Sequence, residues 1–138
     1  MTGRVASPAA AVGRLFIVDD DAGVRTLVTA MLGPAGYEII AVENADAMLH
    51  LIEPGAPSFV AAVVDYSMPR ISGVELVRAI REVGLNAPIV LISEYGYDRV
   101  REGIAGLDGV TFLPKPFSSP ELCAAVEAAV AASGRRQA

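Results

Sequence analysis

The sequence FVAAVVDYSMPRISGVEL, residues 59–76, contains the clearest indication of how this chain folds. It opens on six successive apolar residues, which predicts a strand that is covered on both of its faces. Asp65 ends this strand, and a loop with Pro69 leads into apolar residues at helical spacing, including Val74, Val77 and Ile80. A doubly covered strand followed by a helix is typical of a strand–helix unit in a parallel sheet.

The same pattern recurs on both sides of that stretch. Four further apolar runs lie at LFIV (15–18), YEIIAV (37–42), PIVLIS (88–93) and VTFLP (110–114), and segments with helical spacing separate them. We expect N-caps at Asp21, Asn44 and Ser119. The sequence therefore predicts an α/β fold, with a five-stranded parallel sheet, doubly wound and flavodoxin-like, in the strand order 2-1-3-4-5 with five helices.

Composition restricts the classes of protein to which the chain can belong. Its 138 residues are 53% hydrophobic and 20% charged, which predicts one folded domain. The net charge of −5 argues against nucleic-acid binding, and no apolar run is long enough to span a membrane. The single cysteine, Cys123, excludes an internal disulfide and fits the cytoplasmic location that we expect. We predict a flexible N-terminal lead at 1–13, a folded domain at 14–132 and a C-terminal tail at 133–138.

Polar side chains end four of the five predicted strands. They are the acidic run 19–21, Asp65, Ser93 and Lys115. The carboxyl ends of parallel strands share one edge, where ligands bind in such sheets. Carboxylates that meet there repel one another unless a cation is present, and Mg²⁺ prefers oxygen ligands. Since aspartates can form aspartyl phosphates, the sequence predicts a magnesium site in which one of the strand-end carboxylates attacks phosphorus and the lysine bridges a carboxylate or a phosphoryl oxygen.

Four motifs in this order resemble the receiver domains of two-component response regulators. They are VDDDAGVR (18–25), VVDYSMPRISGVEL (63–76), VLISE (90–94) and FLPKPF (112–117), and the resemblance covers about residues 14–132. It implies that the chain accepts a phosphoryl group from a phosphohistidine and then switches a protein-interaction surface. The implied partners are a histidine kinase or a histidine phosphotransfer protein and an unidentified downstream protein. Such a domain is not a conventional enzyme, since it assists only its own phosphotransfer and autodephosphorylation, and we expect a monomer or weak dimer.

The resemblance also implies a role for particular residues. Asp65 is the implied phosphoacceptor, and Ser93 and Lys115 are the groups that contact the phosphoryl group. The implied ligands of Mg²⁺ are Asp19 (through water), Asp20, Asp65 and the backbone carbonyl of Ser67. The implied switch consists of Ser93 and Phe112, and the bond between Lys115 and Pro116 is implied to be cis.

Two residues are expected to tune the site. Ser67 is small, which leaves room for the water that removes the phosphoryl group. Glu94 departs from the family, in which the residue after the serine or threonine is usually small. Its carboxylate either repels an incoming phosphodonor or points to solvent, and the sequence leaves both interpretations open.

Three other interpretations remain at this point. The chain is either a single-domain regulator, which its start at Met1 favours, or a receiver of a hybrid kinase. A pseudo-receiver adaptor that is never phosphorylated would not need the complete set of acidic, serine and lysine residues. A phosphatase of the haloacid dehalogenase class would use the Asp-x-Asp pattern within 19–21, but that class has a cap domain for which this chain is short.

Overall fold

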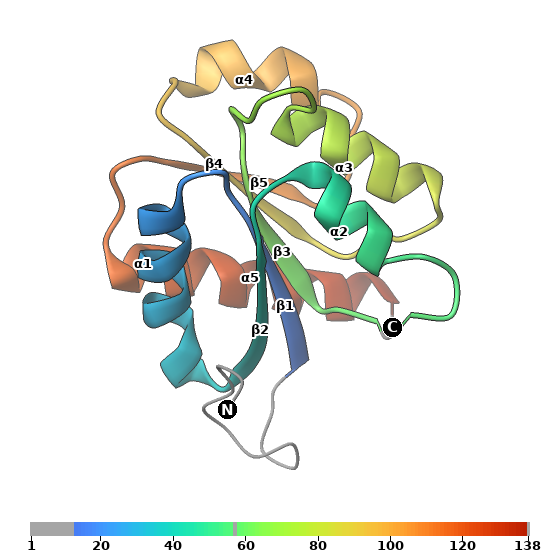
Figure 1. Cartoon of the computed structure of the whole chain (residues 1–138), viewed down its shortest axis with the longest axis horizontal. Helices are drawn as coiled ribbons and strands as arrows, with labels where there is room; N and C mark the ends of the chain where they lie inside the picture. Colours follow the sequence, from blue (N-terminus) through green and yellow to red (C-terminus); the bar gives the residue numbers. More distant parts are fainter. Residues whose placement is uncertain (1–12, 57, 138) are drawn as a thin grey trace.

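The structure is a computed structural model that describes residues 13–56 and 58–137 (Figure 1). The predicted N-terminal lead therefore lies outside the described residues, apart from Gly13. Strands and helices alternate along the chain in this order: β1 (Gly13–Val18), α1 (Ala22–Leu32), the short 3-10 helix η2 (Gly33–Ala35), β2 (Tyr37–Val42), α2 (Ala45–Leu51), β3 (Ala61–Asp65), α3 (Gly73–Glu82), β4 (Ile89–Ser93), α4 (Tyr97–Ile104), β5 (Val110–Pro114) and α5 (Ser119–Gln137).

All five strands are parallel and lie in the order β2-β1-β3-β4-β5, which confirms the predicted fold class and strand order. The chain reverses its direction of winding after β2, so β1 and β3 are neighbours at the centre of the sheet. Their register pairs Val18 with Val64. The residues that follow these two positions, Asp19 and Asp65, therefore leave the sheet side by side.

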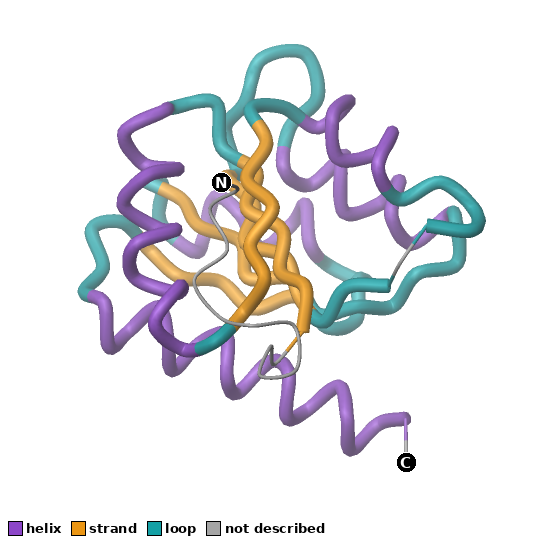
Figure 2. The backbone as a smooth tube through the Cα atoms, turned by 60° about the horizontal axis from the view of Figure 1, so that its bottom comes forward, coloured by secondary structure: helices purple, strands orange, loops and turns teal. Residues whose placement is uncertain are grey.

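Helices cover both faces of the sheet, as Figure 2 shows. One core lies beneath α1 and α5, and the other lies beneath α2, α3 and α4. Successive strand residues enter opposite cores: Leu15 and Ile17 face the α1/α5 side, whereas Phe16 and Val18 face the other. Two buried faces explain why the strands read as unbroken apolar runs.

The helix starts follow the predicted capping chemistry with one correction. Asp21 accepts hydrogen bonds from the backbone N–H groups of Gly23 and Val24, and Asn44 caps α2, so both predicted caps are confirmed. The cap of α5 is not Ser119 but Ser118, which exchanges hydrogen bonds with Glu121 (2.7 and 3.2 Å). The predicted cap was wrong by one residue because both positions are serines, and only the reciprocal partner three residues on distinguishes them.

Element ends differ from the sequence prediction in three places. β3 begins at Ala61, while Phe59 packs its ring edge-on to Phe16 at 5.1 Å between centroids. The spacing of Val100, Ile104 and Leu107 predicts a helix over about 98–107, whereas α4 ends at Ile104. α5 continues through residues 133–137, where the sequence predicted a short tail.

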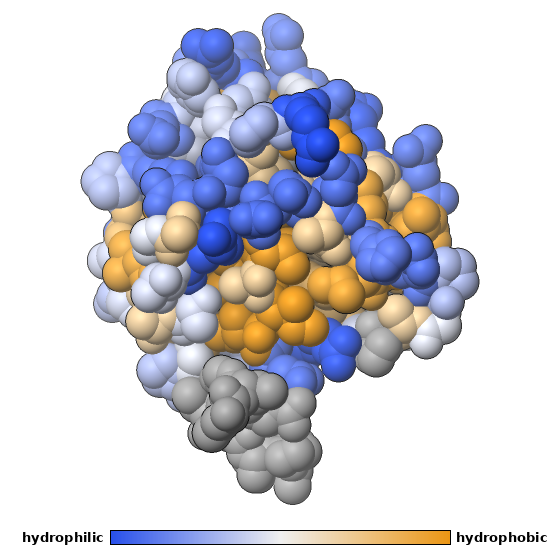
Figure 3. Space-filling model, in the orientation of Figure 1, coloured by the Kyte–Doolittle hydropathy of each residue, from blue (hydrophilic) through white to orange (hydrophobic). Residues whose placement is uncertain are grey.

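The edge strand β2 leaves apolar surface exposed. Figure 3 shows this surface between α1 and α2, along the edge of the sheet at which no described residue adds a strand to β2. Within residues 13–56 and 58–137, none of the helices has both the length and the apolar character needed to cross a bilayer.

Candidate functional site

Three aspartates meet at the carboxyl edge of the sheet. Asp19 and Asp20 follow β1, and Asp65 is the last residue of β3. One carboxylate oxygen from each lies within 4.8 Å of the others. The adjacency of β1 and β3 creates this cluster, so it follows from the strand order that the sequence predicted.

Asp19 is almost fully buried, with 1% of its surface exposed. Its Oδ1 accepts a hydrogen bond from the Asp21 N–H at 2.9 Å. Its Oδ2 has no hydrogen-bond partner among the residues that the structure describes, and it lies 3.7 Å from Nζ of Lys115. Burial raises the pKa of Asp19, and the Asp21 hydrogen bond and the Lys115 charge only partly oppose that rise. A buried carboxylate oxygen without a donor carries a desolvation cost that a bound cation would remove.

Asp65 is the second buried carboxylate and has 5% of its surface exposed. Lys115 Nζ donates a hydrogen bond to its Oδ1 at 3.3 Å. Burial raises the pKa of Asp65 to about 6, and the neighbouring Asp19 carboxylate adds to the rise against the opposing charge of Lys115. The site therefore holds more negative charge than its one lysine can neutralise.

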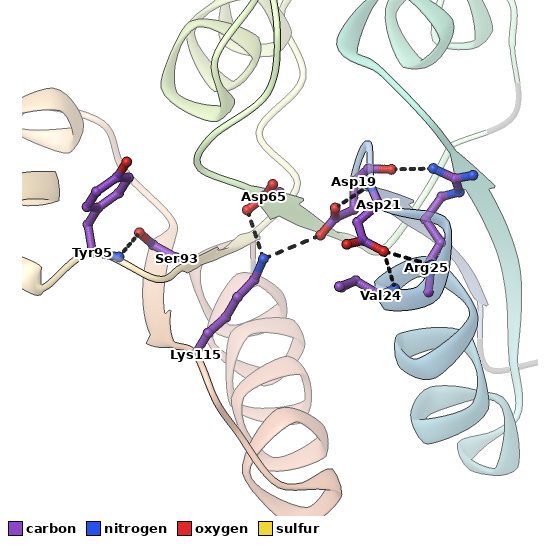
Figure 4. A network of polar contacts seen from close by, with 9 residues as sticks. Asp19, Asp21, Val24, Arg25, Asp65, Ser93, Tyr95 and Lys115 are labelled. Carbon is purple, nitrogen blue, oxygen red and sulfur yellow. Dashed lines mark hydrogen bonds and ion pairs between the residues drawn. The ribbon is translucent and has the colours of Figure 1, made fainter.

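Lys115 reaches both carboxylates from the loop after β5, as the dashed lines in Figure 4 show. Its backbone N–H donates to the Ser93 carbonyl at 2.7 Å, which anchors it beside the end of β4. Burial alone would lower the pKa of Lys115, but Asp65 and Asp19 outweigh that effect and raise it. The ammonium therefore stays charged, and the peptide bond to Pro116 is cis, as the sequence predicted.

The donor set fits a hard divalent cation such as Mg²⁺. The three clustered side chains offer carboxylate oxygens, which Mg²⁺ prefers, and the described residues place one of these oxygens in the interior without a hydrogen-bond partner. Asp20 is exposed, so the cluster opens to solvent on one side, as a cation that keeps several waters requires.

An open cavity of about 910 Å³ gives access to this cluster. Ser67 and Glu94 lie on its wall together with the acidic residues and Lys115, and the remaining lining residues are Val24, Leu27, Pro116 and Phe117. Leu27 shares the apolar helical spacing of α1 with the buried Val28 and Leu32, yet 53% of its surface is exposed. Helical spacing places a residue on a face of the helix without showing where the neighbouring layer ends.

Gly73 allows the backbone after Asp65 to fold closely. Its N–H donates to the Tyr66 carbonyl at 2.9 Å. A Cβ at this position would collide with the backbone carbonyl oxygen of Asp65 and would lie 3.0 Å from Cδ1 of Leu91. The glycine begins α3, and its lack of a side chain permits close packing against Asp65.

The structure does not bring the Ser93 hydroxyl to the acidic cluster. Ser93 is buried, and its Oγ accepts a hydrogen bond from the Tyr95 N–H at 2.9 Å, so its side chain faces Tyr95 and not Asp65 (Figure 4). The Tyr95 ring packs edge-on to Tyr66 at 5.9 Å and lies 4.3 Å beneath the guanidinium of Arg99. Nothing in the sequence pattern indicated this contact between the segments that follow β3 and β4.

The other two predicted site residues, Phe112 and Glu94, lie on different parts of the fold. Phe112 lies on β5 and is half-buried, and its ring packs against Tyr97 at 5.7 Å. Glu94 is exposed and lines the cavity, near enough to Lys115 to act on it electrostatically. Glu94 is therefore open to solvent and also borders the entrance of the cavity, and these are the positions that the two interpretations of its carboxylate require.

Comparisons with known proteins agree with this geometry. The family model described as "Response regulator receiver domain" matches residues 15–127. The "Response regulator MprA" of Mycolicibacterium vanbaalenii is 37% identical over 117 residues, which is 83% of this chain and 49% of the relative. The chain therefore spans about half the length of the curated relatives that it matches.

Solved structures resemble the fold closely. A response regulator receiver protein from Sinorhizobium medicae has a TM-score of 0.78 at 27% identity, covering 90% of this chain and 98% of that one. The Francisella response regulator 1452 receiver domain has a TM-score of 0.76 at 23% identity, covering 88% of this chain and 98% of that one. The latter similarity bears on the fold alone.

Proposed function

The chain belongs to the response regulator receiver domains of two-component systems, and from this membership we propose that Asp65 accepts a phosphoryl group from a phosphohistidine. The observation that carries the proposal is the buried Asp65 carboxylate beside Lys115, in a cluster with two further aspartates. A carboxylate at the floor of an open cavity is positioned to attack an incoming phosphorus atom.

The transfer forms one bond and breaks another. An Asp65 oxygen forms a bond to phosphorus while the bond from phosphorus to the donor imidazole nitrogen breaks, and the nitrogen keeps the electron pair. Lys115, 3.3 Å from Asp65, balances charge on the transferring oxygens. Asp19, Asp20, Asp65 and the Ser67 carbonyl would hold Mg²⁺, which supplies further charge neutralisation when bound.

Phosphorylation then acts on the Ser93 hydroxyl. A phosphoryl group adds negative charge and three acceptor oxygens beside β4. We propose that the Ser93 hydroxyl, whose oxygen now accepts from the Tyr95 N–H, turns toward one of these oxygens and donates its hydrogen to it. This movement changes the loop before α4, and Phe112, which packs against Tyr97 of α4, follows it. The switched surface is therefore the one formed by α4, β5 and α5.

A histidine kinase or a histidine phosphotransfer protein is the proposed phosphodonor, and the proposed role of the switched surface is to bind a downstream protein. The chain is not proposed to turn over a substrate, since its chemistry ends on its own aspartate. Because the chain spans about half of its curated relatives, this proposal concerns the receiver and leaves the output of a longer protein aside.

Intact mass spectrometry after incubation with phosphoramidate and Mg²⁺ tests the proposal. We expect the wild type to gain one phosphoryl group and Asp65→Asn to gain none. Asp21→Asn is the matched control, because Asp21 caps α1 and is not one of the clustered aspartates. The proposal is wrong if the wild type stays unmodified, or if Asp65→Asn gains the group at the same rate.

A further inference from the structure

Glu94 has a charge that the proposed transfer does not use. It follows Ser93 directly, is exposed, and lines the cavity that leads to Asp65. The buried acids sit at the floor of this cavity, whereas Glu94 borders its opening to solvent. The Glu94 carboxylate is therefore the first of these negative charges that an entering phosphodonor meets.

The cavity wall is strongly negative. Its lining residues carry five carboxylates, which belong to Asp19, Asp20, Asp21, Asp65 and Glu94, and a single ammonium from Lys115. Five negative charges and one positive charge leave a net of −4, and a bound divalent cation reduces this to −2. An anionic phosphodonor must therefore approach against a negative potential, to which Glu94 contributes at the entrance.

We propose that Glu94 makes this receiver select among phosphodonors by their charge, disfavouring doubly charged small anions over singly charged ones. This inference rests on the proposed function, since it concerns the donors that reach Asp65. Glu94 acts on the approach of the donor and takes no part in bond formation. It is thus a specificity-determining residue for the transfer.

Two small donors differ in the charge needed to test this. Acetyl phosphate is doubly negative near pH 7, and its P–O bond to acetate breaks when the Asp65 oxygen forms its bond to phosphorus. Phosphoramidate carries a net single negative charge, and its P–N bond breaks with ammonia as the leaving group. Both steps leave the same aspartyl phosphate, so the product does not depend on the donor.

Coulomb's law gives the expected relation between the two donors. The interaction energy is proportional to the product of the charges, so it is twice as large for the doubly charged donor. Removing the charge at position 94 therefore raises the rate with acetyl phosphate by the square of the factor found with phosphoramidate. At the distances of a cavity mouth, we expect factors of about three for phosphoramidate and about nine for acetyl phosphate.

The experiment compares phosphorylation rates of the wild type and Glu94→Gln by intact mass, at saturating Mg²⁺ and low salt. Glutamine has nearly the same shape as glutamate, so a purely steric role would leave both rates unchanged. Glu94→Asp keeps the charge and should stay within about twofold of the wild type. Glu82→Gln is the matched control, because it removes an exposed charge at the far end of α3, about 15 Å of helix away from the site end.

Salt provides a second readout that shape does not affect. Raising the ionic strength to about 0.5 M shortens the screening length to about 4 Å, so both rate factors should fall toward one. The role of Glu94 would be refuted if Glu94→Gln and the wild type react at the same rate at low salt. It would also be refuted if the rate ratio of the two proteins is the same for both donors and does not change with salt. Either result leaves the proposed function intact. If no variant gains a phosphoryl group from either donor, the proposed function fails and the inference fails with it.

Discussion

Neutralising Asp65 should stabilise the fold when no divalent cation is present. Asp65 lies buried near Asp19, and its pKa is raised from 3.8 to about 6. A raised pKa means that the folded state binds protons more tightly than the unfolded chain, so the charged form opposes folding. Asp65→Asn keeps the shape of the side chain and removes this charge.

The size of the effect follows from the two pKa values. The shift from 3.8 to about 6 corresponds to about 3 kcal/mol in free energy of unfolding at pH 7.5, where Asp65 is ionised in both states. Wild-type stability should rise as the pH falls through about 6, because the folded state takes up the proton first. By the same linkage, the advantage of Asp65→Asn shrinks to about half at pH 5.

Urea denaturation in EDTA at pH 7.5 and pH 5, followed by circular dichroism, measures this difference. We expect the midpoint of Asp65→Asn to exceed that of the wild type at both pH values, with the larger gap at pH 7.5. Adding Mg²⁺ should raise the wild-type midpoint and close much of the gap, because the cation binds only the folded state. Equal midpoints in EDTA at pH 7.5, or a gap that widens toward pH 5, would refute the reasoning.

Three further changes test other parts of the structure. Gly73→Ala should lower the free energy of unfolding by about 3 kcal/mol through its collision with the Asp65 carbonyl, whereas Gly96→Ala, which meets nothing within 4 Å, should change it little; urea denaturation compares them. Asp20→Asn should weaken Mg²⁺ binding at least about tenfold by titration calorimetry, while Asp21→Asn should retain binding and lose only part of its helix cap. Arg81→Met removes hydrogen bonds to the carbonyls of the α3–β4 and α4–β5 connections and should cost about 2 kcal/mol in thermal unfolding; an unchanged melting temperature would contradict that role.

The sequence predicted the sheet well because its strands are buried on both faces. Runs such as LFIV and PIVLIS contribute successive residues to opposite cores, as strands inside a parallel sheet do. The strand order alone places Asp19 beside Asp65, so their proximity could be predicted without knowing the conformation of any side chain. Lys115 reaches the same place because β5 ends at the same edge.

Details that depend on loop backbone were beyond the sequence. The orientation of Ser93 is set by the Tyr95 N–H, whose direction depends on how the loop before α4 turns. The reach of Arg81 to carbonyls in two connections depends on where those connections end, which spacing along a helix does not reveal. The cap of α5 failed for a similar reason, since neighbouring serines differ only in the partner that each can reach.

The Lys115–Asp19 ion pair joins nearly opposite ends of the folded sequence, and this has a consequence for protein synthesis. During synthesis, Asp19 and Asp65 emerge from the ribosome well before Lys115, because Lys115 belongs to the last strand–helix unit. Until that unit emerges, the two buried acids have no counter-charge and β4 lacks its neighbour. A partly synthesised chain therefore lacks the lysine that the proposed phosphorylation of Asp65 uses.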